Sequence, residues 1–235
     1  MLIIIPAFNE EENLKSLLPE IIKYHPRADI LLIDDGSADQ TSQIADQYDV
    51  AVIRLKNQGI GKAMQAGFLY AIKNGYDTAV QIDGDGQHDP AWLKKIIGPI
   101  SAGKADFVIG SRYVKHNPDR SYKTPFLRRM GMYYSSVLLF LATGTFISDT
   151  TSGFRALNHD VLKFFETNYP AKYPEAGALL MLILANFKIE EVPIKMRSRK
   201  TGRSMFTLTR AIFYPLHVMI GFIEIFLKFR DGQIK

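Results

Sequence analysis

Residues 78–88, with the sequence Thr-Ala-Val-Gln-Ile-Asp-Gly-Asp-Gly-Gln-His, decide the fold and indicate the chemistry. The first five residues form a short, mostly apolar run that is typical of a buried strand. Asp83 and Asp85 follow directly, and because the chain turns where a strand ends, both carboxylates can face one ion. Mg²⁺ typically binds one or two carboxylates together with substrate phosphates. We therefore predict a Mg²⁺ or Mn²⁺ site at Asp83 and Asp85, with Gln87 as a third oxygen ligand.

Two other ion- or phosphate-binding loops are excluded by their required residues. An EF-hand loop that starts at Asp83 needs Gly at its sixth position and Glu at its twelfth, where this chain has His88 and Lys94. Residues 58–62 contain a Gly-Lys pair, but a Walker A loop needs Ser or Thr after the lysine and here Ala63 follows.

The sequence around residues 78–88 alternates short apolar runs with amphipathic stretches. Strands separated by helices are typical of βαβ units, which build a mostly parallel α/β sheet with helices on both faces. The expected strands are residues 2–5, 30–33, 51–55, 78–82 and 107–109, and the expected helices are residues 10–24, 41–48, 61–74 and 90–102. In such a sheet, ligands bind beyond the carboxyl ends of the strands.

Polar or glycine residues follow each of these expected strands, at 6–10, 34–37, 57–59, 83–88 and 110–112. A carboxylate at Asp34 or Asp35 can accept a hydrogen bond from a base N–H or a ribose hydroxyl, as the acidic residue of dinucleotide folds does. The alternative is a glycine turn capped by Asp and Ser side chains, and the two interpretations are compatible. Five polar strand ends on one edge predict a ligand site.

The chain is less regular after residue 117. An apolar stretch at 133–147 leads into a polar turn at 149–155, which carries a carboxylate and an arginine. Residues 160–192 are expected to be helical and then extended. A basic run follows at 195–203, directly before the apolar C-terminal part of the chain.

Residues 211–227 are largely apolar, and on a helix Arg210, His217 and Glu224 lie on one narrow stripe. A bilayer span needs roughly 20 apolar residues, whereas this run is shorter and contains ionisable groups. We therefore expect a juxtamembrane helix that lies at the membrane interface or against a partner. The expected division is a catalytic domain over 1–205 and this membrane- or partner-associating helix over 206–235.

The composition sets wide limits. The formal net charge of +5 permits anionic partners of several kinds. The absence of cysteine excludes disulfides and Cys-based zinc sites, and it fits a reducing, cytosolic environment. Residues 1–5 are too short an apolar run for a signal peptide and are expected to form the first strand.

Several ordered motifs resemble the family-2 glycosyltransferases and, more narrowly, the dolichyl- and polyprenyl-phosphate sugar synthases. The resemblance is dense over residues 1–160 and looser to about residue 205. The motifs that carry it are Ile-Pro-Ala-Phe-Asn-Glu-Glu at 5–11, Asp-Asp-Gly-Ser-Ala-Asp at 34–39, Gly-Lys-Ala at 61–63, Asp-Gly-Asp-Gly-Gln-His at 83–88, Gly-Ser-Arg-Tyr at 110–113 and Ser-Gly-Phe-Arg at 152–155.

This resemblance implies a GT-A fold, which is Rossmann-like, and an inverting transfer that uses Mg²⁺ or Mn²⁺. The nucleotide-binding residues that it implies are Pro6, Ala7, Asn9, Glu10, Asp34, Asp35, Gly61, Lys62, Asp83 and Gly84. The metal ligands that it implies are Asp83, Asp85 and Gln87. The catalytic or phosphate-binding residues that it implies are Asp85, Arg112, Arg128, Asp149 and Arg199, with Glu175 as the alternative to Asp149 for a base.

The acceptor is expected to be a polyprenyl phosphate. A sugar hydroxyl needs a general base, whereas a lipid phosphate is already anionic and needs cations that hold it. The basic run at 195–203 would lie at headgroup level beside the apolar helix, which favours the lipid over the hydroxyl of a polysaccharide or glycolipid. By family analogy the donor is expected to be UDP-glucose or UDP-N-acetylglucosamine.

These expectations place the protein peripherally on the cytoplasmic face of the cell membrane. Tyr-Pro-Glu at 173–175 resembles a subgroup that works beside a small membrane protein, and self-association stays open. A nucleic-acid-binding module is the weaker alternative, because Asp83 and Asp85 would place negative charge at its binding edge. A membrane scaffold without catalytic activity would not need the carboxylate pair.

Overall fold

The computed structural model describes the chain except residues 116, 118–123, 171–173, 199–207 and 235, and the side chains of residues 208–212 are likewise outside the description. Within the described residues, seven strands form one sheet in the order β3-β2-β1-β4-β6-β5-β7. The strands are β1 (Leu2–Ala7), β2 (Asp29–Asp34), β3 (Ala51–Arg54), β4 (Thr78–Gln81), β5 (Phe107–Ser111), β6 (Arg155–Asn158) and β7 (Ile189–Pro193).

The expectation of a mostly parallel sheet is confirmed, and the exception is β6. This strand runs antiparallel between β4 and β5, with Arg155 paired to Gln81 on one side and to Ile109 on the other. An antiparallel strand begins at the edge where its parallel neighbours end. The polar turn at 149–155 therefore lies at the carboxyl edge of the sheet, beside the loop that follows β4.

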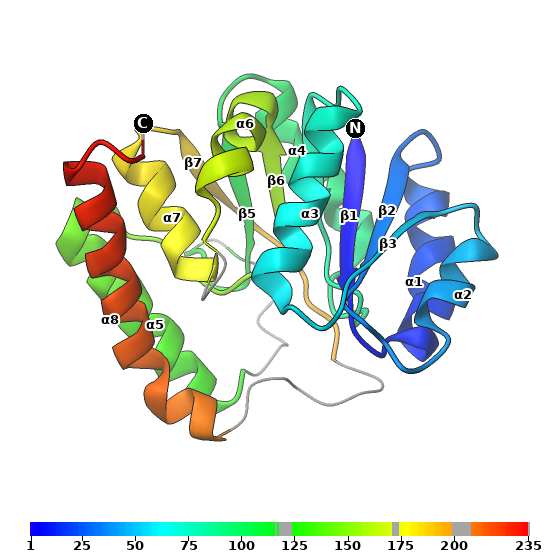
Figure 1. Ribbon diagram of the computed structural model, residues 1–235, viewed down its shortest axis with the longest axis horizontal. Coiled ribbons are helices and arrows are strands. Elements are labelled where there is room, and N and C mark those ends of the chain that lie inside the picture. The colour runs from blue at the N-terminus through cyan, green and yellow to red at the C-terminus, as the bar shows by residue number, and fades with distance from the viewer. Residues whose placement is uncertain (116, 118–123, 171–173, 199–207, 235) are drawn as a thin grey trace.

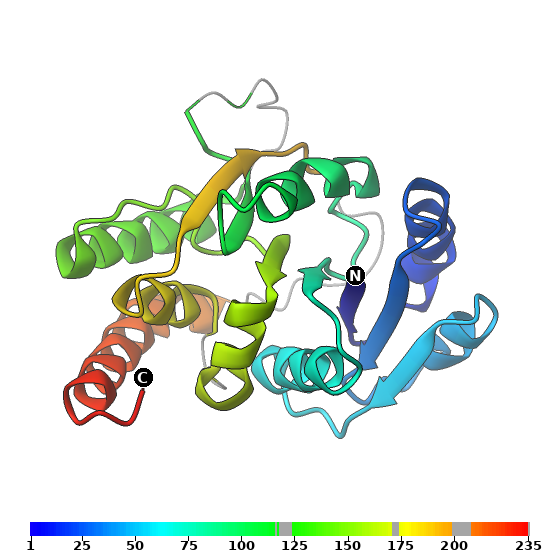
Figure 2. The ribbon, with the colours of Figure 1, turned by 90° about the horizontal axis from the view of Figure 1, so that it is seen from above.

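Helices cover both faces of the sheet, as expected (Figures 1 and 2). Helices α1, α2 and α4 share a hydrophobic cluster with one face, and α3, α6, α7 and α8 share a cluster with the other. The helices are α1 (Glu11–Tyr24), α2 (Thr41–Asp46), α3 (Ile60–Lys73), the short 3₁₀ helix η1 (Pro90–Trp92), α4 (Leu93–Ser101), α5 (Phe126–Thr143), α6 (His159–Asn168), α7 (Pro174–Leu184) and α8 (Leu208–Arg230).

Strand β1 lies at the centre of the core because both of its faces are apolar. Leu2 and Ile4 belong to the cluster under α3, whereas Ile3 and Ile5 belong to the cluster under α1. A strand that is buried on both faces reads as a continuous apolar run, which is why this segment was identifiable from its sequence.

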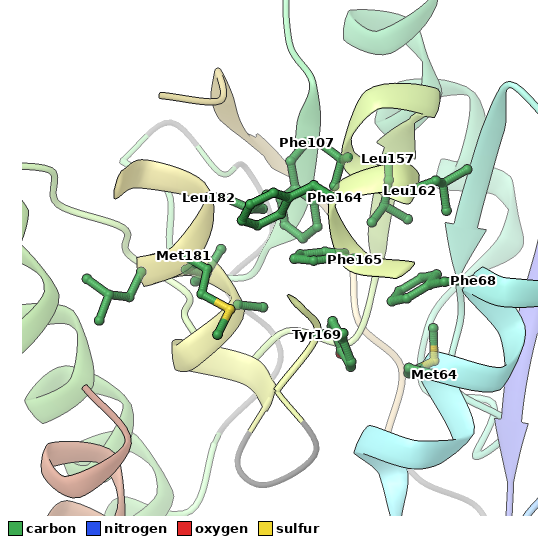
Figure 3. Packing of buried hydrophobic residues seen from close by; sticks show 14 of the residues in the cluster. Met64, Phe68, Phe107, Leu157, Leu162, Phe164, Phe165, Tyr169, Met181 and Leu182 are labelled. Carbon is green, nitrogen blue, oxygen red and sulfur yellow. The ribbon is translucent and has the colours of Figure 1, made fainter. Parts of the chain in front are cut away.

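Aromatic packing joins the helices on one face to the sheet (Figure 3). The ring centroids of Phe68 on α3 and Phe165 on α6 lie 5.6 Å apart, and Tyr169 meets both rings edge-on. Phe165 also contacts Phe107 of β5. Burial raises the pKa of the Tyr169 hydroxyl, which keeps it neutral. This packing joins α3 and α6 to each other and to β5.

Helix α8 packs along α5 and α7 (Figures 1 and 2). Tyr214, Val218, Phe222 and Ile225 are buried in the same cluster that covers the sheet. One face of α8 therefore belongs to the same hydrophobic core as the sheet. Among the described residues, no helix combines the length and the apolar character that crossing a membrane requires.

Candidate active site

The loops after β1 and β2 are held side by side by hydrogen bonds. The Asn9 N–H donates to Ser37 Oγ at 2.9 Å, and Asn9 Oδ1 accepts the N–H of Ala38 at 2.8 Å. The Glu10 N–H donates to Thr41 Oγ1 at 2.9 Å. Asn9 itself adopts a left-handed φ of 56°, which Asn tolerates better than most residues. Asn9 and Glu10, two expected nucleotide residues, are thus fixed at the carboxyl edge.

Asp34 holds the turn after β2 and is fully buried. Its carboxylate accepts the Ser37 N–H at 2.8 Å and the Ser42 hydroxyl at 2.5 Å, and Arg54 lies 3.7 Å away. Burial raises the pKa of Asp34, but these hydrogen bonds and the Arg54 charge outweigh it, so the pKa is lowered overall. Asp34 therefore holds its own turn from within, and its expected contact with the nucleotide stays a prediction.

Asp35 ties the end of β2 to the start of α3. Its two carboxylate oxygens accept the backbone N–H groups of Gln58 and Gly59, each at 2.7 Å. Gly59 precedes α3 with a φ of 86°, a conformation that favours glycine. Gly61 and Lys62 follow in the first turn of α3, where Gly61 is buried and Lys62 is exposed. Asp35 therefore positions the loop that was expected to meet the nucleotide.

Asp35→Ala is expected to weaken nucleotide binding, because it removes a charged acceptor and releases two backbone N–H groups. A hydrogen bond to a charged group contributes roughly 1.5–3 kcal/mol. Titration calorimetry with free nucleoside diphosphate measures the change, and a thermal melt reports folding. Asp46→Ala, at an exposed position of α2, is the matched control. A dissociation constant that matches the wild type would reject the role of Asp35.

Asp83 and Asp85 lie in the loop after β4, and both side chains are partly exposed. Asp83 Oδ1 accepts a hydrogen bond from Gln81 Nε2 at 3.2 Å, and the Asp83 N–H donates to His88 Nδ1 at 3.3 Å. Asp85 Oδ1 accepts the N–H of Gln87 at 3.0 Å. The end of β4 therefore holds the Asp83 carboxylate, the loop holds the Asp85 carboxylate, and both side chains keep some exposed surface.

Gly84, between these two aspartates, lies against the end of β1. Its N–H donates to the Pro6 carbonyl oxygen at 3.2 Å. A Cβ at this position would lie 3.1 Å from the same oxygen and 3.2 Å from the Ala7 Cβ. Glycine therefore lets the loop after β4 close onto β1, which brings Pro6 and Ala7 beside the aspartates.

The donor atoms of this loop fit a divalent metal that is shared with a substrate. The described residues contain no group of three or more His, Cys, Asp or Glu side chains that could enclose an ion. Two carboxylates that are partly exposed match the Mg²⁺ pattern, in which substrate phosphates complete the coordination. Asp83 and Asp85 are the residues that would hold such an ion.

Gln87 connects the same loop to the segment after β7. Its carbonyl oxygen accepts the Arg197 N–H at 2.8 Å, and its Nε2 donates to the Arg197 carbonyl oxygen at 3.3 Å. Arg197 in turn pairs with Glu20 at 2.6 Å and with Asp89 at 2.9 Å. Burial lowers the pKa of Arg197, but these partners outweigh it and raise the pKa overall. Gln87 therefore anchors the start of the basic run, and its role as a metal ligand stays a prediction.

Arg112 and Asp149 form a buried ion pair at the carboxyl edge. Arg112 Nη2 lies 2.6 Å from Asp149 Oδ1, and Arg112 Nε lies 2.7 Å from Asp149 Oδ2. Arg112 Nη2 also donates to Thr151 Oγ1 at 2.9 Å. Glu191 of β7 accepts the N–H groups of Ser148 and Asp149, which fixes the turn. Asp149 thus orients an arginine, and the direct phosphate contact expected of Arg112 stays a prediction.

The remaining expected residues lie around this edge. Arg128 is partly exposed in the first turn of α5, and Glu175 is partly exposed in the first turn of α7. Arg199 lies outside the described residues. His88, for which no role was expected, is buried and stacked on Phe154 with ring centroids 5.0 Å apart. The sequence does place His88 three residues after Asp85, which could have suggested a role near the carboxylates. Its stacking on Phe154 could not be predicted, because Phe154 is distant in the sequence.

Comparisons with known proteins agree with this architecture. A crystal structure of glucosyl-3-phosphoglycerate synthase from Mycobacterium tuberculosis, in complex with Mn²⁺, UDP-glucose and phosphoglyceric acid, superposes with a TM-score of 0.71. The match covers 95% of this chain and 78% of that chain at 18% sequence identity. It shows that the two proteins share a fold.

The sequence comparisons define the family. The family model described as Glycosyl transferase family 2 matches residues 2–164, which is more than half of the chain. Polyprenol monophosphomannose synthase from Mycolicibacterium smegmatis is 33% identical over 86% of this chain and 79% of its own length. UDP-N-acetylglucosamine–dolichyl-phosphate N-acetylglucosaminyltransferase from Methanococcus voltae is 31% identical over 94% of this chain and 91% of its own length. The chain belongs to glycosyl transferase family 2.

Proposed function

We propose that this protein transfers a sugar, with inversion, from a nucleoside diphosphate sugar to a polyprenyl phosphate at a membrane surface. The observation that carries the proposal is the pair of partly exposed carboxylates, Asp83 and Asp85, at the end of β4 in a family-2 chain. The relatives from Mycolicibacterium smegmatis and Methanococcus voltae have names that specify polyprenol and dolichyl phosphate. Because both relatives are similar to this protein over most of its chain, they support an acceptor of the same class.

The residues of the site divide the work between the donor and the acceptor. Asp83 and Asp85 would hold a Mg²⁺ or Mn²⁺ ion, which neutralises charge on a diphosphate leaving group. Asp35 and the loops after β1 and β2 hold the nucleotide. The acceptor phosphate oxygen attacks the anomeric carbon on the face opposite the leaving diphosphate, which inverts the configuration.

The surroundings of Asp149 support a phosphate acceptor. Both Asp149 oxygens accept hydrogen bonds from Arg112, and the side chain is fully buried. A carboxylate in this state is poorly placed to take a proton from a sugar hydroxyl. A lipid phosphate is already ionised at neutral pH and needs no such base. Arg128 and the basic run are the candidate groups that would hold it.

A donor and acceptor panel tests the proposal. Purified protein with Mn²⁺ is incubated with polyprenyl phosphate and each common nucleotide sugar, and the lipid product is identified by mass spectrometry. We expect a single preferred donor, with UDP-glucose and UDP-N-acetylglucosamine as the first candidates. Transfer to a free glycan hydroxyl, with none to polyprenyl phosphate, would overturn the acceptor assignment.

An exposed apolar surface on α5 and α8 supports action at a membrane. The two helices lie side by side, and their first turns lie toward the carboxyl edge of the sheet (Figure 1). The large apolar side chains exposed on them, which we name the α5/α8 surface, are Phe126, Leu127, Met130, Tyr133, Phe140, Leu141, Phe213, Leu216, Met219, Ile220, Ile223, Phe226 and Leu227. Apolar surface of this extent is typical of an interaction site.

Replacing Leu216, Ile220 and Ile223 together by Ser is expected to reduce vesicle binding at least about tenfold. These side chains are 44–53% exposed, so they contribute little to the core, and burying apolar area in a membrane gains about 25 cal/mol per Å². Co-sedimentation with vesicles that contain anionic lipid measures the effect, and a thermal melt verifies folding. The control is Ile22→Ser, at an exposed position of α1. Unchanged vesicle binding by the triple variant would reject the membrane role of this surface.

Deleting residues 206–235 is a different experiment, because α8 also has a buried face. The deletion removes Val218, Phe222 and Ile225 from the core cluster, so it is expected to destabilise the whole fold. Substitutions on the exposed face therefore separate membrane binding from stability, whereas truncation does not.

A further inference from the structure

The carboxylate of Asp83 lies directly against the backbone of Gly153. A Cβ built at Gly153 would lie 2.6 Å from Asp83 Cγ and still closer to both carboxylate oxygens. Real Cβ atoms essentially never approach other atoms within 3.0 Å. Any side chain at position 153 would therefore displace the carboxylate or the backbone beneath it.

The antiparallel strand β6 explains this contact. Gln81 pairs with Arg155 in the β4–β6 ladder, and one strand runs forward while the other runs backward. Continuing that register by two residues places Asp83 opposite Gly153. The two residues are 70 positions apart in the sequence, so no local pattern predicts that they meet.

The backbone at Gly153 is fixed from both sides. The Ser152 hydroxyl donates to the Gly110 carbonyl oxygen at 2.6 Å, and the Phe154 carbonyl oxygen accepts the Gly110 N–H at 2.8 Å. Phe154 is fully buried, and its ring stacks on His88. Because the backbone is held on the sheet, an added side chain would displace the Asp83 carboxylate, whose side chain is 35% exposed.

We propose that Gly153 is a positioning residue for the metal site, because its lack of a side chain leaves the space that the Asp83 carboxylate occupies. The carboxylate also lies beside the ring of His88, which stacks on Phe154. This inference rests on the proposed role of Asp83 as a metal ligand. It adds that the turn before β6 sets where that ligand stands.

The test measures Mn²⁺ binding directly, by electron paramagnetic resonance on the full chain without nucleotide sugar. Gly153→Ala is expected to raise the Mn²⁺ dissociation constant by about 10- to 100-fold, the range typical when residues that orient a metal ligand are changed. The matched control is Gly98→Ala on α4, where a Cβ would meet nothing within 4 Å. An equal Mn²⁺ affinity in Gly153→Ala and the wild type would overturn the inference.

Thermal melts of a double-mutant cycle test the steric contact without any metal. Gly153→Ala should lower the melting temperature of the wild type only slightly, because the atoms that it displaces are the end of a flexible side chain, and it should not lower it in an Asp83→Ala background, where the carboxylate is gone. Equal losses in both backgrounds, or a double variant that fails to fold, would overturn the inference. If the wild type binds no Mn²⁺ either alone or with free nucleoside diphosphate, the proposed metal assignment fails, and the melts still decide whether Gly153 makes room for Asp83.

Discussion

Asp85→Ala is expected to abolish sugar transfer, by a factor on the order of 1000 or more, while the protein stays folded. Without Asp85, the negative charge that develops on the leaving diphosphate is no longer neutralised in the transition state. Stabilisation of such charge is commonly the largest contribution to an enzymatic rate. Asp85 is partly exposed, and its carboxylate accepts the Gln87 N–H of its own loop, so its removal should cost little stability.

Transfer rates with Mn²⁺ measure this effect, and circular dichroism melts verify folding. Asp77→Ala, at an exposed position directly before β4, is the matched control at the opposite end of that strand. EDTA should produce the same loss in the wild type. Transfer that survives in EDTA or in Asp85→Ala would contradict a metal-assisted mechanism.

Asp149→Ala is expected to destabilise the fold by about 3–5 kcal/mol, because it leaves the buried Arg112 guanidinium without its counter-charge. Both side chains of this pair are at most 5% exposed, so water cannot compensate for the lost partner. Urea denaturation measures the free energy of unfolding.

Two further variants isolate the cause. Asp149→Asn keeps the shape of the side chain and removes its charge, so it should fall between the wild type and Asp149→Ala. Glu12→Ala breaks the exposed Lys15–Glu12 pair and should have little effect, because surface ion pairs contribute little. If Asp149→Ala unfolds at the same urea concentration as Glu12→Ala, the buried pair does not have the structural role assigned here.

The sequence predicted the first half of the fold well, because each strand there is a continuous apolar run and each helix has one apolar side. The polar residues after β1, β2 and β4 could also be placed on one edge from the rule for parallel sheets. The burial and the contacts of each individual side chain could not be predicted in the same way. Asp34 and Asp35 are neighbours with the same chemistry, yet Asp34 is fully buried in its turn, whereas Asp35 holds the start of α3.

The second half shows why local patterns were insufficient. Strand β6 has four residues and only two apolar ones, so it lacks the signal of a buried strand. Its antiparallel insertion nevertheless decides which residues face Asp83. The His88–Phe154 stack, the Gly153 contact and the Glu191 contacts to the turn at 148–149 all join segments that are distant in the chain.

The position of β6 also constrains the order in which the protein can fold. Strand β5 pairs with β6 and β7 and not with β4, so it has no partner in the sheet until residues 155–158 are present. During synthesis, the finished half β3-β2-β1-β4 therefore presents β4 as an open edge. Open edges invite pairing with other chains, and non-local pairings form slowly. The emerging chain is expected to be most exposed to aggregation between the completion of β4 and the arrival of β6, and the loop after β4 gains its contacts with the turn before β6 only when that interval ends.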